Sequence, residues 1–235
     1  MLAIKLCSCR LAEVAIGVAF AVWALHNGAA AAVDYRIEPL AAAADIDGLS
    51  DNITEQLAPT GIKIMRGNRT FCELWPAKSW AVKAGFSPSA SVLYPFSVGE
   101  LMGVVRYKLK ATDFRGQEIA AGAYTLRYGL QPVDGNHAGT SPTRDFLLLL
   151  PTEKDTTAAA VEESSLFKLS AEVAGGTHPT MLLLMPFEGA ADDLPQLAHD
   201  EANERWSVSF AGNGRSDGKA AKVPVNLVVV GQAAE

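Results

Sequence analysis

The sequence predicts an all-β protein: a single antiparallel β-sandwich, of jelly-roll or related order, with one or two peripheral helices. First, about eight segments alternate apolar and polar residues or are wholly apolar, and turn formers separate them at the short intervals typical of sandwiches. Second, 49% of the 235 residues are hydrophobic and 20% are charged, which excludes a disordered chain and a coiled coil. Third, helical spacing is rare, which argues against alternating strands and helices.

Residues 1–32 have the order of a secretory signal peptide, which precedes this fold. Lys5 and Arg10 come before the apolar stretch 11–25, and small residues follow at 28–32. The apolar stretch is shorter than the roughly 20 residues of a spanning helix. We therefore expect cleavage, a periplasmic or extracellular protein, and no membrane span in the mature chain. An uncleaved N-terminal anchor is the alternative.

The segment 33–60 is acidic and rich in alanine, so we expect a lead-in with a short helix at 51–57 rather than core. The sandwich domain is predicted to span 61–235. It begins with alternating apolar and polar residues at 62–66 and 70–75, which predict a hairpin.

Three prolines interrupt 75–96, which predicts a long surface connection with Trp80 exposed on it. The strongest pattern follows, because apolar and polar residues alternate through 100–112 and again through 119–130. Turn residues at 113–117 separate these runs. The pattern predicts a long antiparallel hairpin.

The stretch 131–143 is dense in turn formers, and four consecutive leucines within 145–151 predict a strand buried on both faces. Near-helical apolar spacing predicts a helix over 158–174, capped by Thr156 or Thr157. Three further strands are predicted at 180–187, 204–211 and 222–230.

The charge of the chain argues against a nucleic-acid partner, and its cysteine content argues against a disulfide. The chain has 26 acidic and 20 basic residues, a formal charge of −6, so it lacks the basic excess that nucleic-acid binding needs. Removal of the signal peptide would leave Cys72 as the one cysteine, so we expect no intramolecular disulfide.

Three short motifs resemble catalytic or ion-binding patterns but lack essential parts. An S-x-x-K sequence stands at 165–168 without the K-T-G of penicillin-recognising enzymes. The glycine-rich run 212–219 has Asn213 where a phosphate loop needs glycine and is followed by Ala220 instead of Ser or Thr. The acidic run 45–55 fails the calcium-loop register. The sequence therefore favours a non-catalytic protein and leaves an activity open.

The polar loop at 131–145 is the best candidate binding site, because loops at the end of a rigid sandwich commonly carry binding residues. The ligand would be a small molecule, a glycan or an envelope protein. An exposed Trp80 would favour a saccharide by stacking, and a flat apolar patch would favour a protein. The candidate ligand-binding residues are Trp80, Arg127, Gln131, Asp134, Asn136, His137, Arg144 and Asp145.

A divalent-metal site is the alternative. His137 and His178 would hold copper or zinc if they meet at one end of the sandwich, and Met181 or Met185 would add a soft ligand that favours copper. The histidines lack the spacing of known metal motifs, so loop hydrogen bonds without any cofactor are the favoured interpretation.

The sequence Y-T-L-R-Y-G-L-Q-P-V-D-G-N-H at 124–137, with D-F-R-G-Q at 113–117 and R-D-F at 144–146, resembles a family of uncharacterised exported bacterial proteins. The resemblance covers the middle and later parts of the mature chain. It implies a bacterial, exported β-domain and brings no activity, cofactor or site residue.

Overall fold

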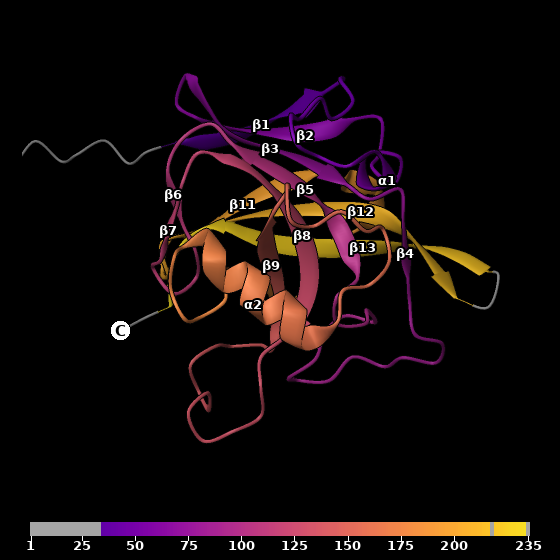
Figure 1. Ribbon diagram of the computed structural model, residues 1–235, viewed down its shortest axis with the longest axis vertical. Helices are drawn as coiled ribbons and strands as arrows, with labels where there is room; N and C mark the ends of the chain where they lie inside the picture. Colours follow the sequence, from indigo (N-terminus) through magenta and orange to yellow (C-terminus); the bar gives the residue numbers. More distant parts are fainter. Residues whose placement is uncertain (1–33, 217–218, 234–235) are drawn as a thin grey trace, which may run out of the picture. The chain divides into compact units, whose positions relative to one another are not determined.

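The computed structural model describes residues 34–216 and 219–233, in which thirteen strands, two α-helices and one 3₁₀ helix are found (Figure 1). The strands are β1 (Tyr35–Leu40), β2 (Gly61–Arg66), β3 (Arg69–Pro76), β4 (Ser79–Ala81), β5 (Leu101–Tyr107), β6 (Ala111–Thr112), β7 (Glu118–Ile119), β8 (Gly122–Leu130), β9 (Asp145–Pro151), β10 (Met181–Met185), β11 (Gln196–Asp200), β12 (Arg205–Ser216) and β13 (Lys219–Val230). The helices are α1 (Asp51–Thr54), α2 (Glu163–Val173) and the 3₁₀ helix η1 (Ala191–Asp193).

Eleven strands form one curled sheet in the order β1-β2-β3-β5-β8-β9-β10-β13-β12-β11, with β4 added in parallel beside β12. The curl occurs at β10, where Met181–Leu183 pair with β9 while Leu184 and Met185 pair with β13. As a result β12 and β13 lie across the core from β8 and β9 (Figure 1). The predicted all-β fold with peripheral helices is confirmed.

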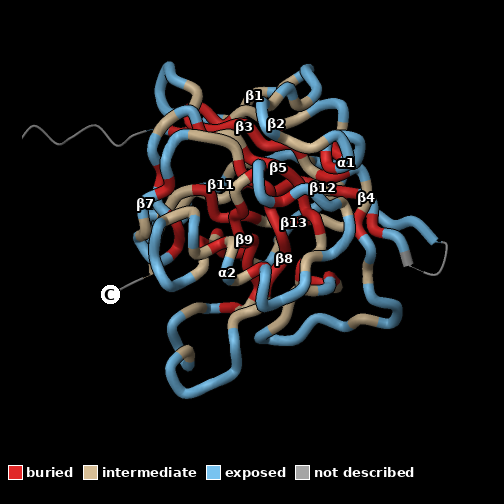
Figure 2. Tube along the Cα trace, in the orientation of Figure 1, coloured by how far each residue is buried: buried red, intermediate tan, exposed pale blue. Residues whose placement is uncertain are grey.

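The main core fills the space between these two layers (Figure 2). Aromatic rings join the layers: Trp80 meets Phe96 and Phe210 edge-on at centroid distances of 5.4 and 6.3 Å, and Phe96 meets Tyr128 at 5.4 Å. The alternation predicted for β8 is confirmed, because Tyr124, Leu126 and Tyr128 belong to this core. The opposite face of β8 carries the residues that bear on the candidate site.

Helix α2 packs over the outer face of β9 and buries Leu166 completely. Burial on both faces explains the four consecutive leucines of β9. The predicted cap was wrong: Glu162, rather than Thr156 or Thr157, accepts hydrogen bonds from the first turn of the helix. The helix starts later than predicted because a buried ion pair fixes the loop before it, as described below.

The described part of the predicted lead-in, residues 34–60, packs into the domain and contributes to its core. β1 pairs with β2 along six residues, and Ile53 and Leu57 are buried against Trp75. Helix α1 occupies four residues of the predicted 51–57. The sequence showed no clear periodicity of apolar residues there, because the helix is short and small residues surround it.

Two other strands were missed. β4 lies within the predicted surface connection 75–96, and β11 is a mostly exposed strand paired only with β12. The hairpin 62–75 is confirmed, as is the long hairpin of β5 and β8, which β6 and β7 extend. The predicted signal peptide, residues 1–32, lies outside the described residues. No helix within the described ranges is long and apolar enough to cross a membrane.

Candidate functional site

A cavity of about 460 Å³ on the outer face of β8 and β9, beside α2, brings His137 and His178 to one site; we call it the histidine pocket. Its apolar lining includes Phe114, Leu130, Phe146, Leu148, Phe167 and Met181. Its polar lining comprises Arg115, Gln131, His137, Thr140, Thr177 and His178. A mainly apolar cavity with a few polar groups is the usual form of a small-molecule site.

Glycine in β8 helps to open this space. Gly129 lies opposite Phe146 in the β8–β9 ladder and lines the pocket. A Cβ at this position would lie 2.9 Å from a methyl of Leu148, so a larger residue would occupy space between the strand and the pocket. At this point β8 therefore contributes no side chain to the pocket, and the neighbouring β9 side chains Phe146 and Leu148 line it.

One wall of the pocket is organised by Asp113, which is fully buried. Its carboxylate accepts hydrogen bonds from the backbone N–H groups of Arg115, Gln117 and Met181, at 2.8 to 3.1 Å. It also accepts from the side-chain amide of Gln117, which donates in addition to the carbonyl of Pro179. This carboxylate therefore joins the turn at 113–117 to the segment that carries His178.

The opposite wall is the loop 131–143, exposed at the lower end of the molecule in Figures 1 and 2. Gln131 and Arg144 close the base of this loop, because Gln131 N–H donates to the Arg144 carbonyl and Arg144 Nε donates back, each at 2.8 Å. Gln131 also donates to the Thr140 hydroxyl, which donates to the carbonyl of His137. These bonds fix the loop with His137 at the pocket.

The ring of His137 is oriented by Asp134. Nδ1 of His137 lies 2.7 Å from Oδ1 of Asp134, which also accepts the backbone N–H groups of Asn136 and His137. The hydrogen bond from His137 lowers the pKa of Asp134, so the carboxylate is ionised and Nδ1 is the donor. Nε2 of His137 is then the ring nitrogen left for a ligand.

The predicted binding residues thus divide into three groups. Gln131 and His137 line the pocket together with His178, while Asp134, Asn136 and Arg144 shape the loop or line the smaller cavity behind it. Trp80, Arg127 and Asp145 lie elsewhere, buried in the domain.

Trp80 is not an exposed stacking platform. It is 1% exposed, its indole N–H donates to the carbonyl of Met102 at 3.1 Å, and its ring packs between the layers. The prediction failed because the prolines around it mark turns at the surface, whereas Ser79–Ala81 enters the sheet beside β12. A saccharide site based on Trp80 is therefore excluded.

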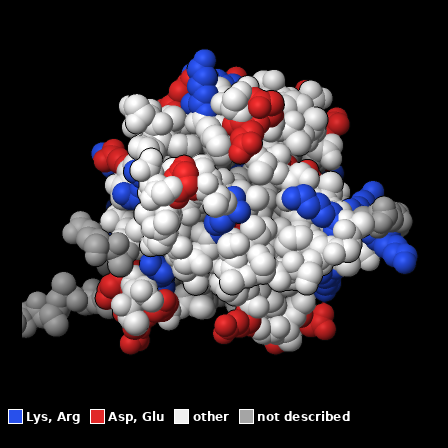
Figure 3. Space-filling model, turned by 90° about the horizontal axis from the view of Figure 1, so that it is seen from below, with Lys and Arg blue, Asp and Glu red and all other residues white. Residues whose placement is uncertain are grey.

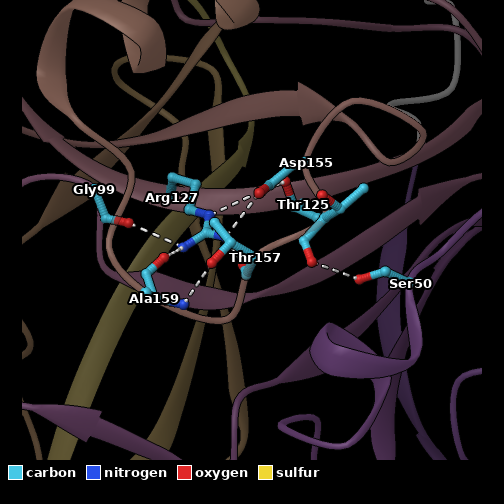
Figure 4. A network of polar contacts seen from close by, with 8 residues as sticks. Ser50, Gly99, Thr125, Arg127, Asp155, Thr157 and Ala159 are labelled. Atoms are coloured by element: carbon cyan, nitrogen blue, oxygen red, sulfur yellow. Dashed lines mark hydrogen bonds and ion pairs between the residues drawn. The ribbon is translucent and has the colours of Figure 1, made fainter.

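Arg127 is not a ligand-binding group either, because it is fully buried beneath the loop 152–162 (Figure 4). Its Nε and Nη2 each lie 2.8 Å from a carboxylate oxygen of Asp155, and Thr125 donates to the same carboxylate. The guanidinium also donates to the carbonyls of Gly99, Thr157 and Ala159. The arginine therefore binds the loop that leads into α2.

Asp145 is likewise a structural group. It is fully buried and accepts the backbone N–H groups of Leu93 and Tyr94 and the hydroxyl of Tyr128, at 2.6 to 3.1 Å. Burial raises the pKa of Asp145, and these hydrogen bonds oppose the rise. Asp145 joins the proline-rich connection to β8 and β9.

Sequence reasoning missed the pocket's apolar lining and Arg115. Phe114 and Phe146 lie with ring centroids 5.9 Å apart, on segments 32 residues apart in the sequence, so no local pattern joins them. The signal that was present was the concentration of polar residues in 131–143, which located one wall correctly.

The structure supports the predicted metal ligands only in part. Met181 lines the pocket with both histidines, whereas Met185 does not. Within the described part of the chain, no group of three or more His, Cys, Asp and Glu side chains is placed to hold a metal ion. A metal would therefore depend on two histidines and Met181.

The surface seen from the loop end is mostly uncharged, with acidic and basic side chains scattered over it (Figure 3). No protein-family model, curated protein or solved structure matches the chain. The site is therefore interpreted from its own residues, and the resemblance to exported bacterial proteins stays a prediction.

Proposed function

We propose that this domain is a non-catalytic binding protein that holds a small, partly apolar molecule in the histidine pocket. The observation that supports this most strongly is the cavity itself, of about 460 Å³, which aromatic and aliphatic side chains line together with a few polar ones. That volume lies in the range of about 300–1,000 Å³ typical of drug-sized ligands. Export through residues 1–32 remains part of the proposal.

The pocket is favoured over a protein-docking surface because its apolar groups are recessed. Among the described residues, Val133 is the one large apolar side chain found strongly exposed, at 80%. A single exposed valine does not make the extended apolar patch that marks a protein interface. The pocket is also held by hydrogen bonds on both sides, so it is preformed rather than created by the ligand.

A neutral fluorescent naphthalene dye, N-phenyl-1-naphthylamine, tests this proposal. The dye is expected to brighten on binding wild-type protein, and Thr177→Trp should weaken binding by at least about tenfold by filling the pocket. Thr156→Trp is the matched control, because Thr156 is exposed and lies outside the pocket. Absence of dye binding, or equal binding by Thr177→Trp, would exclude the pocket.

A second candidate function is the binding of a copper or zinc ion. It is favoured by the placement of His137, His178 and Met181 around one cavity, with Asp134 orienting the His137 ring as carboxylates orient metal-bound imidazoles. Protein purified without chelators should then carry metal that His137→Ala loses and His199→Ala retains. Metal-free protein whose melting temperature does not change with added Cu or Zn would reject this function.

A further inference from the structure

The charged groups of the histidine pocket all have one sign. Of the titratable side chains that line it, Arg115 is cationic and His137 and His178 can become so. Among the described residues that line the pocket, none is Asp or Glu. Acidic side chains are therefore under-represented in the pocket lining, because acidic residues outnumber basic ones by 26 to 20 in the chain.

The acidic residues nearest in sequence to the pocket lining, Asp113 and Asp134, already accept hydrogen bonds from groups of the protein. Asp113 accepts four hydrogen bonds that hold its own wall together, and Asp134 Oδ1 accepts three within its loop. Neither Asp113 nor Asp134 lines the pocket, so a cationic ligand would meet no carboxylate among the described lining residues. An anion would find a guanidinium and two imidazoles.

The apolar lining of the pocket indicates that the ligand also carries an apolar group. Phe114, Phe146 and Leu148 line the pocket but are almost fully buried, so its accessible apolar surface comes mainly from the half-buried Leu130, Phe167 and Met181. A small hydrated anion such as phosphate would leave this surface without a contact. An alkyl or aryl group would gain the free energy of removing both surfaces from water.

We propose that the pocket binds amphiphilic monocarboxylates, with the carboxylate beside Arg115, His137 and His178 and the alkyl or aryl group against Leu130, Phe167 and Met181. This inference rests on the proposed small-molecule function and specifies its ligand. Arg115 and His178 come from the two segments that Asp113 joins, so the structure holds both near the head group before a ligand arrives.

Competition against N-phenyl-1-naphthylamine tests the inference, with decanoate, decanol and decyltrimethylammonium compared on the full chain below their micelle-forming concentrations. These molecules share one chain length and differ in the charge of the head group. Decanoate is expected to displace the dye at a concentration about tenfold lower than decanol does, and the ammonium compound should be the weakest.

The Arg115→Ala/His178→Ala variant should lose most of the preference for decanoate over decanol. Arg69→Ala/His199→Ala is the matched control, because both side chains are exposed and lie outside the pocket. It should keep the wild-type preference.

Equal displacement by decanoate and decyltrimethylammonium would overturn the inference, as would an unchanged preference in the Arg115→Ala/His178→Ala variant. In both cases dye binding to wild-type protein, and its loss in Thr177→Trp, would leave the proposed function standing. Failure of the dye to bind would overturn both together.

Discussion

Arg127 and Asp155 form a two-point ion pair in which both side chains are almost fully buried, at 0% and 1% exposure. The pair connects the middle of β8 to the loop that precedes α2, and thereby holds α2 over β9. Since α2 supplies Phe167 to the histidine pocket, a group outside the pocket contributes to its shape.

Removal of the arginine should be strongly destabilising. Arg127→Met leaves the carboxylate of Asp155 buried without its partner, and we expect the free energy of unfolding to fall by about 3–5 kcal/mol in urea denaturation. Lys110→Met is the control, because the Lys110–Glu118 pair has a similar distance of 2.7 Å but is exposed. That change should cost less than about 1 kcal/mol. Similar losses in both variants would contradict the structural role of Arg127.

A methyl group at Gly212 should be poorly tolerated. A Cβ there would overlap the six-membered ring of Trp80, which the core holds in place. Gly212→Ala is expected to lower the free energy of unfolding by about 1–3 kcal/mol, and the loss should be smaller when Trp80→Phe has made room. Gly135→Ala, where a Cβ meets open space, should have little effect. Additive losses in the double variant would place Trp80 elsewhere.

Cys72 should make stability fall at alkaline pH. Burial raises the pKa of its thiol, so the folded protein keeps the proton above the pH at which the unfolded thiol loses it. Unfolding then releases a proton, and stability decreases as pH rises above about 8.5, by at most about 1.4 kcal/mol per pH unit.

The measurement compares urea denaturation from pH 7 to 10 for two proteins that both carry Cys7→Ser and Cys9→Ser. One retains Cys72 and the other has Cys72→Ala. The steeper alkaline loss should appear only with Cys72 present. Identical slopes, or rapid reaction of the native thiol with Ellman's reagent, would show that Cys72 is accessible.

Asp113 should control both stability and the pocket. Asp113→Asn replaces one accepting oxygen by a donor that faces backbone N–H groups, so we expect a loss of about 1–3 kcal/mol and weaker binding of the naphthalene dye. Asp200→Asn, which alters an exposed turn, serves as the control for both readouts. Unchanged dye binding in Asp113→Asn would mean that the wall does not need this carboxylate.

The sequence predicted those parts of the fold that depend on local alternation. The period of two in 119–130 correctly separated the core residues Tyr124 and Leu126 from Thr125 and Arg127. That pattern could not show which residues pack against the outer face of β8. Arg127 was predicted to bind a ligand, because no local pattern shows that Asp155, 28 residues away, pairs with it.

The candidate site was predicted only in part, because local composition shows the loop but not the distant segments that pack beside it. Polar loop composition located His137, and the common cavity meets the condition set for the metal alternative, that His137 and His178 lie at one end of the domain. The aromatic lining depends on α2 crossing β9, which no single segment specifies. Trp80 was misplaced because prolines indicate turns but not whether the residues between them enter a sheet.

Imidazole NMR can show whether His137 and His178 flank one ligand cavity. During titration with N-phenyl-1-naphthylamine, the ring carbon-bound proton signals of His137 and His178 should shift together and saturate at the same dye concentration, while those of His199, stacked on Trp206, stay unchanged. Shifts confined to one of the two histidines, or shared equally with His199, would show that His137 and His178 do not flank one ligand site.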